Sequence, residues 1–303
     1  MKKLTLFLFL SLLIPNTWQN INSGEPTPMN IELINSDINS TTLKFTMDGF
    51  HLIKSDETSF DSYSVKSENG ASILMEGAPD LHNFSTSIIV PDQSKMSVNV
   101  ISYKYHDYEN INIVPSKGNL TRDINPDDIP LIYSEAYEKD EFFPSNISVL
   151  GNPYILRDLR GQSLSFNPFQ YNPVTKTLRV YSEIIIETFS DGYSENNSIN
   201  RVSDSITLSS NYDEIYKTHF INYNNDTRFN YLVDQGNMLI ISNPAFINYM
   251  QPLVNWKNKK GIPTTLVSTT ETGSSSSQIS NYISDYYFEN GLTFVLLVGD
   301  YAQ

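Results

Sequence analysis

The chain of 303 residues contains no cysteine. The side chains that we consider for catalysis or metal binding are therefore its histidines and carboxylates. A thiol nucleophile, a thiolate zinc site and a disulfide are therefore excluded within the sequence. The four histidines are scattered without metal-ligand spacing, and we interpret each as a surface or packing residue. They are His51, His82, His106 and His219. The sequence also contains no nucleophile elbow, Walker loop or dinucleotide-binding glycine motif.

Two places carry carboxylates that could bind a metal ion. Asp123, Asp127 and Asp128 lie within six positions of one another and offer the hard oxygen donors that calcium prefers, with an Asx-rich turn around Pro126 as the alternative. Asp300 follows an apolar run directly. It is a candidate metal ligand or loop anchor, and the alternative is a carboxylate that caps a strand end.

The overall composition excludes some classes of protein. The formal charge of −14 has the wrong sign for binding a phosphate backbone, so we expect no nucleic-acid partner. The chain has 19 Tyr and 16 Phe, which supply bulk for a hydrophobic core and argue against wholesale disorder. The length corresponds to about two domains, at roughly 150 residues for each.

The N-terminus is typical of an export signal. Lys2 and Lys3 precede the apolar run Leu4–Ile14, which is too short for a membrane span of about 20 residues. We therefore expect a signal peptide over residues 1–23, cleaved between Asn20 and Gly24, with an uncleaved anchor as the alternative. No later segment has the length and apolarity of a membrane helix. The mature chain is thus expected to lack a membrane span and to be exported by the export machinery, to the extracellular space or the bacterial cell surface.

Residues 24–220 have the pattern of an antiparallel β-sandwich. Apolar and polar residues alternate over 42–47, 97–103 and 177–187, and each run is bounded by Asn, Asp, Gly or Pro. Several short strands with turn residues between them favour two packed antiparallel sheets.

Residues 236–303 have a different pattern, of type β-α-β-α-β. The apolar runs 238–241, 264–267 and 294–298 predict strands of a parallel sheet, and the last two are separated by a helix capped near Ser275. Asn243-Pro244 predicts the start of the first helix and Gly261 its end. The run 294–298 is expected to be a buried, central strand. Since three strands and two helices cannot cover both faces of a sheet, we expect the chain to be truncated, with a partner-completed appendage as the alternative.

Residues 221–235 separate the two patterned regions and are rich in Asn and Asp, as expected of a linker. Arg228 lies in its middle.

Two parts of the sequence resemble gingipain-like cysteine endopeptidases. The first resembles the propeptide of that family, and the second resembles the opening of its caspase-like catalytic domain. The residues that carry the first likeness are Pro115–Arg122, Phe143-Pro144, Pro153–Gly161, Asn167–Pro173 and Thr175–Tyr181. The second likeness rests on Gly236–Ile241, Trp256-Lys257, Lys260-Gly261 and Leu292–Asp300.

This resemblance implies that the chain is the N-terminal part of a secreted cysteine endopeptidase zymogen. Residues 24–220 would be a propeptide that inhibits the protease and assists its folding, and residues 236–303 the incomplete start of the peptidase domain. The catalytic Cys and His of the family are expected beyond Gln303, so the chain is expected to be inactive alone. The expected partners are its own protease domain and, for the full-length enzyme, protein or peptide substrates. No cofactor is expected, and calcium stays open for the full-length protein.

The resemblance also gives roles to three basic residues. Arg228 precedes the first peptidase strand at the distance where the family is processed, and a solvated linker arginine is the alternative. Arg122 is expected on a projecting loop, and if the protease pocket holds a carboxylate, the guanidinium would fill it with two hydrogen bonds. Lys117 is the alternative inserting residue if the pocket prefers an ammonium, and a solvent-facing loop arginine is the alternative to insertion.

A second function class stays open at the level of sequence. The chain could be a secreted, non-catalytic β-sandwich adhesin or carbohydrate-binding protein with an α/β appendage. Tyr103, Tyr105 and Tyr108 would then stack on sugars, although aromatic residues more often pack between strands.

Overall fold

The computed structural model describes residues 18–200, 206–209, 212–223, 229–232 and 236–300. The chain divides into two compact units. Residues 1–200 with 219–226 form one, here called the β unit, and residues 201–218 with 227–303 form the other, the α/β unit. None of the helices in the described residues combines the length and the apolar character needed to cross a membrane.

The β unit is made of strands and two short 3-10 helices. Its strands are β1 (Trp18–Asn20), β2 (Asn30–Ser36), β3 (Ser40–Thr46), β4 (Gly49–Lys54), β5 (Tyr63–Lys66), β6 (Ala71–Ser72), β7 (His82–Ile89), β8 (Ser94–Tyr108), β9 (Ser148–Leu156), β10 (Leu159–Phe166), β11 (Phe169–Asn172) and β12 (Thr177–Tyr193). The 3-10 helices are η1 (Pro126–Asp128) and η2 (Glu135–Tyr137). The three strands expected from alternation over 42–47, 97–103 and 177–187 are β3, β8 and β12, so their prediction is confirmed.

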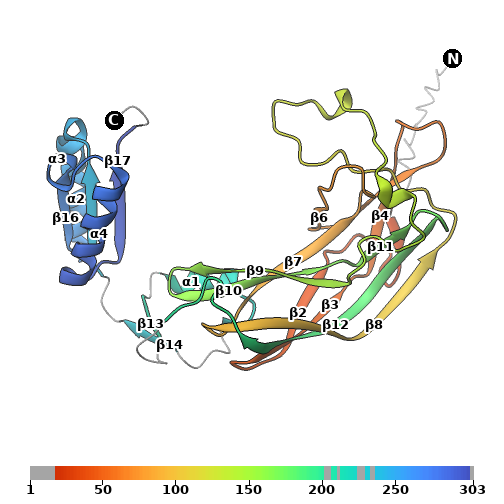
Figure 1. Cartoon of the computed structure of the whole chain (residues 1–303), viewed down its shortest axis with the longest axis horizontal. Helices are drawn as coiled ribbons and strands as arrows, with labels where there is room; N and C mark the ends of the chain where they lie inside the picture. The colour runs from red at the N-terminus through yellow and green to blue at the C-terminus, as the bar shows by residue number, and fades with distance from the viewer. Residues whose placement is uncertain (1–17, 201–205, 210–211, 224–228, 233–235, 301–303) are drawn as a thin grey trace, which may run out of the picture. The chain divides into compact units, whose positions relative to one another are not determined.

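These strands form antiparallel sheets, as the sequence predicts (Figure 1). One sheet has the order β6-β7-β10-β9, and a second has the order β11-β12-β3-β2, with β8 paired along β12. A smaller sheet has the order β1-β4-β5. The two larger sheets share one apolar core, to which β3 contributes alternate buried residues because successive side chains point to opposite faces. Phe45 on β3 stacks on Phe166 on β10, with ring centroids 5.6 Å apart.

A buried arginine joins the two larger sheets at one end. The side chain of Arg160 on β10 is only 1% exposed. Its guanidinium donates to the carbonyls of Pro91 and Ser94, in the turn from β7 to β8, at 2.8 Å each. It also donates to the carbonyls of Asn196 and Asn197, which follow β12, at 3.0 and 2.9 Å. The fork of a guanidinium can serve several carbonyls at once, so this one side chain satisfies loops from both sheets.

The β unit is completed by a short segment from much later in the chain. Asn222 is 5% exposed, and its side chain both accepts from the amide of Ile89 at 2.8 Å and donates to its carbonyl at 3.1 Å. Phe220 and Tyr223 beside it are buried. Residues 221–223, which the sequence assigns to the linker 221–235, therefore pack on the β unit, because an amide side chain can replace a missing strand partner of β7.

The first described strand lies inside the range 1–23 that the sequence assigns to a signal peptide. β1 pairs with β4, with Trp18 opposite His51. The Trp18 indole is buried and donates to the carbonyl of Ser23 at 2.9 Å. A side chain at Gly49 would place its Cβ 2.3 Å from the Trp18 ring, so the absence of a side chain there makes room for the indole. Residues from Trp18 onward are thus part of the folded unit.

The α/β unit has a parallel sheet of order β16-β15-β17 with helices on both faces (Figure 1). Its elements are β13 (Ile206–Ser209), α1 (Asp213–His219), β14 (Phe229–Leu232), β15 (Met238–Ser242), η5 (Pro244–Phe246), α2 (Ile247–Lys259), β16 (Thr264–Ser268), α3 (Thr269–Thr272), α4 (Ser276–Asn290) and β17 (Phe294–Val298). β13 and β14 form a separate parallel pair. The Asn243 side chain caps η5, and Ser275 forms a capping box with Gln278 at the start of α4.

The expected β-α-β-α-β order is confirmed, but the position of the last strand is not as expected. β15 is central, and its alternate residues pack against α2 on one face and α4 on the other. β17 lies at an edge of the described sheet, with Val295 and Leu297 exposed by 42% and 58%. An apolar run has the same appearance in a central strand and in an edge strand, so the sequence alone does not distinguish the two positions.

We predict that Arg160→Met strongly destabilises the chain. Methionine keeps much of the buried stem but removes every donor, which leaves four backbone carbonyls without their partner. The expected loss in free energy of unfolding is about 3 kcal/mol, measured by urea denaturation. The matched control is Arg157→Met, which breaks the partly exposed pair with Asp158 and is expected to cost less than about 1 kcal/mol. Equal losses in the free energy of unfolding of the two variants would contradict a stabilising role for the Arg160 hydrogen bonds.

Candidate functional site

The expected projecting loop lies between β8 and β9. The chain leaves the strands after Tyr108 and returns at Ser148, with only the short helices η1 and η2 between them. Figure 1 shows part of this connection as a yellow-green loop that stands away from the strands. None of the residues 119–128 is buried. The sequence placed Arg122 on such a loop, and the structure agrees.

Arg122 occupies the tip of a tight turn. The amide of Ile124 donates to the carbonyl of Thr121 at 3.1 Å, which places Arg122 and Asp123 at the two central positions. The hydroxyl of Thr121 holds the pKa of Asp123 below its usual range. Arg122 is exposed, and within the described residues its guanidinium has no hydrogen-bond or ion-pair partner. It is therefore free to bind a group outside the unit.

Lys117, the alternative inserting residue, is placed very differently. Its ammonium donates to the carbonyl of Pro126 at 2.8 Å and pairs with the Glu57 carboxylate at 2.6 Å. The side chain is only 14% exposed. Insertion into another protein would break both interactions, so the geometry favours Arg122 over Lys117 as an inserting residue. Sequence reasoning missed Glu57, because nothing near Lys117 in the chain signals a partner 60 positions earlier.

The carboxylates considered for calcium are not brought together with further ligands. Asp127 and Asp128 lie in the exposed helix η1, whose first turn is capped by the Asn125 side chain. This is the Asx-rich turn that the sequence offered as the alternative. In the part of the chain that the structure describes, no three His, Cys, Asp or Glu side chains gather into a metal-binding group. Asp300 directly follows the two residues at the carboxyl end of β17 that line a hollow of the α/β unit.

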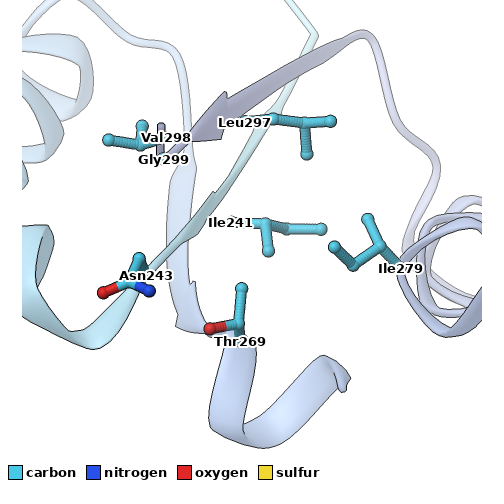
Figure 2. Close-up of a pocket in the computed structure, with 7 residues that line it drawn as sticks. All are labelled: Ile241, Asn243, Thr269, Ile279, Leu297, Val298 and Gly299. Carbon is cyan, nitrogen blue, oxygen red and sulfur yellow. The ribbon is translucent and has the colours of Figure 1, made fainter. Parts of the chain in front are cut away.

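That hollow lies at the carboxyl ends of β15 and β17. It has a volume of about 210 Å³. Figure 2 shows Ile241, Ile279 and Leu297 directed toward the same space from β15, α4 and β17. The other lining residues are Asn243, Thr269, Val298 and Gly299. This edge is where open parallel sheets bind ligands, but the residues that line the hollow include no histidine, cysteine or carboxylate.

The four histidines are not brought together, as expected from their spacing. His51 lies 3.2 Å from a carboxylate oxygen of Glu68, His219 contacts the Tyr154 hydroxyl at 2.7 Å, and His106 is exposed on β8. His82 is buried, and its Nδ1 accepts from the amide of Ser67 at 3.1 Å. Burial and, secondarily, the nearby Lys66 charge lower the pKa of His82 to about 4.

Comparison with known proteins assigns both units. The Propeptide_C25 family model matches residues 19–220, and that of peptidase family C25 matches residues 231–303. The chain belongs to the C25 gingipain family. It contains the propeptide and the start of the peptidase domain of this family.

Two similar proteins come from Porphyromonas gingivalis. Gingipain R2 is 33% identical over 279 residues, and gingipain R1 is 32% identical over 281 residues, in each case over 90% of this chain. The chain spans 38% of the length of gingipain R2 and 28% of that of gingipain R1. A solved structure, a complex of the pro- and mature domains of RgpB, matches 66% of this chain at 34% identity with a TM-score of 0.60.

The buried His82 should make this gingipain propeptide sensitive to acid. Because its folded pKa of about 4 lies below the ordinary value of 6.5, the unfolded chain binds a proton between these pH values that the folded chain does not. The stability that neutral His82 provides is complete above pH 6.5 and is lost as the pH falls toward 4. The loss should be on the order of 2–3 kcal/mol at pH 4.

His82→Gln keeps a hydrogen-bond acceptor but does not titrate, so its free energy of unfolding should fall less between pH 7 and pH 4.5 than that of the unmodified chain. Urea denaturation at both pH values measures this. His106→Gln, at an exposed position on β8, is the matched control and should retain the full acid sensitivity. An unchanged pH dependence in His82→Gln would refute the assignment.

Proposed function

We propose that the β unit is the inhibitory propeptide of a secreted C25 cysteine endopeptidase and that Arg122 inserts into the substrate pocket of the protease. The observation that carries the proposal is an exposed guanidinium without a partner in the described residues, at the tip of a loop whose base is held by polar contacts. An inhibitor that presents a side chain on a preorganised loop loses little conformational freedom on binding. The RgpB complex of pro- and mature domains supports contact between the two parts in this family.

The chemistry of inhibition would be that of a substrate mimic. A guanidinium can form two parallel hydrogen bonds to a carboxylate in a pocket, which fixes both its position and its orientation. The exposed position of Arg122 at a turn allows the side chain to enter without unfolding the sheets. The chain has no cysteine and thus no thiol of its own for peptide hydrolysis. Its peptidase segment contributes the strands β15, β16 and β17 of the parallel sheet.

The adhesin alternative has less support. Tyr108 packs edge-on against Phe50 of the core, at 5.4 Å between centroids, and so is unsuited to stack on a sugar. Tyr103 and Tyr105 are half-exposed but lean on Tyr181. The family match over both units favours the zymogen.

Export is part of the proposal. The basic and apolar N-terminus suits a signal peptide, and a protease precursor of this family would be handed to the export machinery before it reaches the outside of the cell. Since β1 begins at Trp18, we place the end of the signal peptide before Trp18 rather than between Asn20 and Gly24. The N-terminal residue of the exported propeptide tests this placement.

Replacing Arg122 with alanine should weaken inhibition by about one to two orders of magnitude, since a charge-assisted hydrogen bond contributes roughly 1.5–3 kcal/mol. The measurement is the inhibition constant of the full chain against mature gingipain R2. Arg157→Ala, at the exposed β9–β10 turn, is the matched control and should inhibit like the unmodified chain. Thermal unfolding checks that both variants are folded. An Arg122→Ala chain that inhibits as well as the unmodified chain would argue against insertion.

Cleavage after Arg228 is the proposed maturation step. Arg228 lies outside the described residues, but it falls between the buried Tyr223 of the β unit and β14, which begins at Phe229. N-terminal sequencing of the mature protease, from cells that make the complete precursor, should begin at Phe229. Arg228→Ala should block this cut, whereas Arg201→Ala should not. A mature N-terminus inside β15, or normal maturation of Arg228→Ala, would contradict the proposal.

A further inference from the structure

The base of the Arg122 loop is closed by a single side chain. Lys117 precedes Arg122 by five positions and Pro126 follows it by four. The Lys117 ammonium reaches across to the Pro126 carbonyl at 2.8 Å, so the two ends of the loop are tied together. The same ammonium pairs with Glu57 at 2.6 Å, which ties this closed loop to the segment between β4 and β5.

Packing contributes little to the shape of this loop. Residues 119–128 include no buried side chain, and the loop stands over an open hollow of about 650 Å³, lined in part by Glu57, Lys117 and Pro126. Within the loop, the described backbone hydrogen bonds close only short turns, such as the bond from Ile124 to Thr121. An exposed segment of this kind keeps one conformation only if polar contacts offset its conformational entropy.

The backbone around Lys117 and around Glu57 is itself held by hydrogen bonds. Ser116, directly before Lys117, is buried, and its backbone donates to Ala78 and accepts from Gly77. Gly118 then turns the chain with a φ of +81°, a conformation that glycine adopts without strain. On the other side, the amide of Glu57 donates to the Ser55 hydroxyl at 3.3 Å, within a hydrogen-bonded turn. The Lys117 ammonium thus joins a hydrogen-bonded backbone segment to a defined turn.

We propose that Lys117 is a positioning residue, which holds the Arg122 loop in its inserting conformation by linking the Pro126 carbonyl to the Glu57 carboxylate. This inference rests on the proposed inhibitory function, and it gives Lys117 a role opposite to that of an inserting residue. Lys117 acts through Arg122 and touches no group of the protease. Its loss therefore raises the entropic cost of insertion without removing the inserting group.

The test uses the full chain and two measurements. Hydrogen–deuterium exchange of residues 119–128 reports the order of the loop without any protease, and inhibition of mature gingipain R2 reports its effect. In Lys117→Met the loop amides should exchange at least about 5-fold faster, and the inhibition constant should rise about 5- to 20-fold. Lys117→Arg retains a cationic donor and should restore most of both. Lys104→Met, an exposed lysine on β8 paired with Glu183, is the matched control and should change neither.

Two further variants separate this inference from the proposed function. Glu57→Gln should speed exchange less than Lys117→Met, because the bond to the Pro126 carbonyl remains. In an Arg122→Ala background, Lys117→Met should still speed exchange but should not weaken inhibition further. Unchanged exchange in Lys117→Met would overturn the positioning role, as would an additional loss of inhibition in the double variant. If Arg122→Ala alone leaves inhibition intact, the proposed insertion fails, while the exchange data still decide whether Lys117 orders the loop.

Discussion

The hydrogen bonds of the buried Arg160 guanidinium are the interaction on which the geometry of the β unit depends. They hold the β7–β8 turn and the residues after β12 against β10, and so join the two larger sheets at one end. The connection that carries Arg122 leaves from β8 in one sheet and returns to β9 in the other. Its two ends keep a fixed separation only while the sheets stay together. The hydrogen bonds of one buried charge thereby stabilise the two sheets between which the loop is held.

Much of the fold could be predicted from the sequence because its signals are local. Alternation located β3, β8 and β12, and continuous apolar runs located the three strands of the parallel sheet. What the pattern could not give were contacts between distant segments. The return of residues 219–223 to β7 depends on one amide side chain, and Asn222 in sequence looks like any linker asparagine. The edge position of β17 likewise depends on neighbours that an apolar run does not specify.

Of the candidate site, the sequence likewise predicts the local features but not the contacts between distant segments. Turn-forming residues around Pro126 indicated a loop, and this placed Arg122 at an exposed position. The role of Lys117 was not predictable, since a lysine in a polar segment has the same appearance whether it is solvated or bound. Only the fold brings the β4–β5 turn beneath the loop and pairs Glu57 with it. Arg228 rests on its place in the sequence, because it lies outside the described residues.

The use of residues 219–223 to complete the β unit also sets an order of events during folding. The strands β1 to β12 all precede Asn222 in the chain, so they can pair before Asn222 is in place. Until Asn222 is in place, the amide and carbonyl of Ile89 lack the hydrogen-bond partner that they have in the folded unit. The sandwich can collapse early but reaches its final form only when residues 219–223 have packed against it. Completion of the β unit thereby requires that the chain be present up to the residues that lead into the peptidase segment.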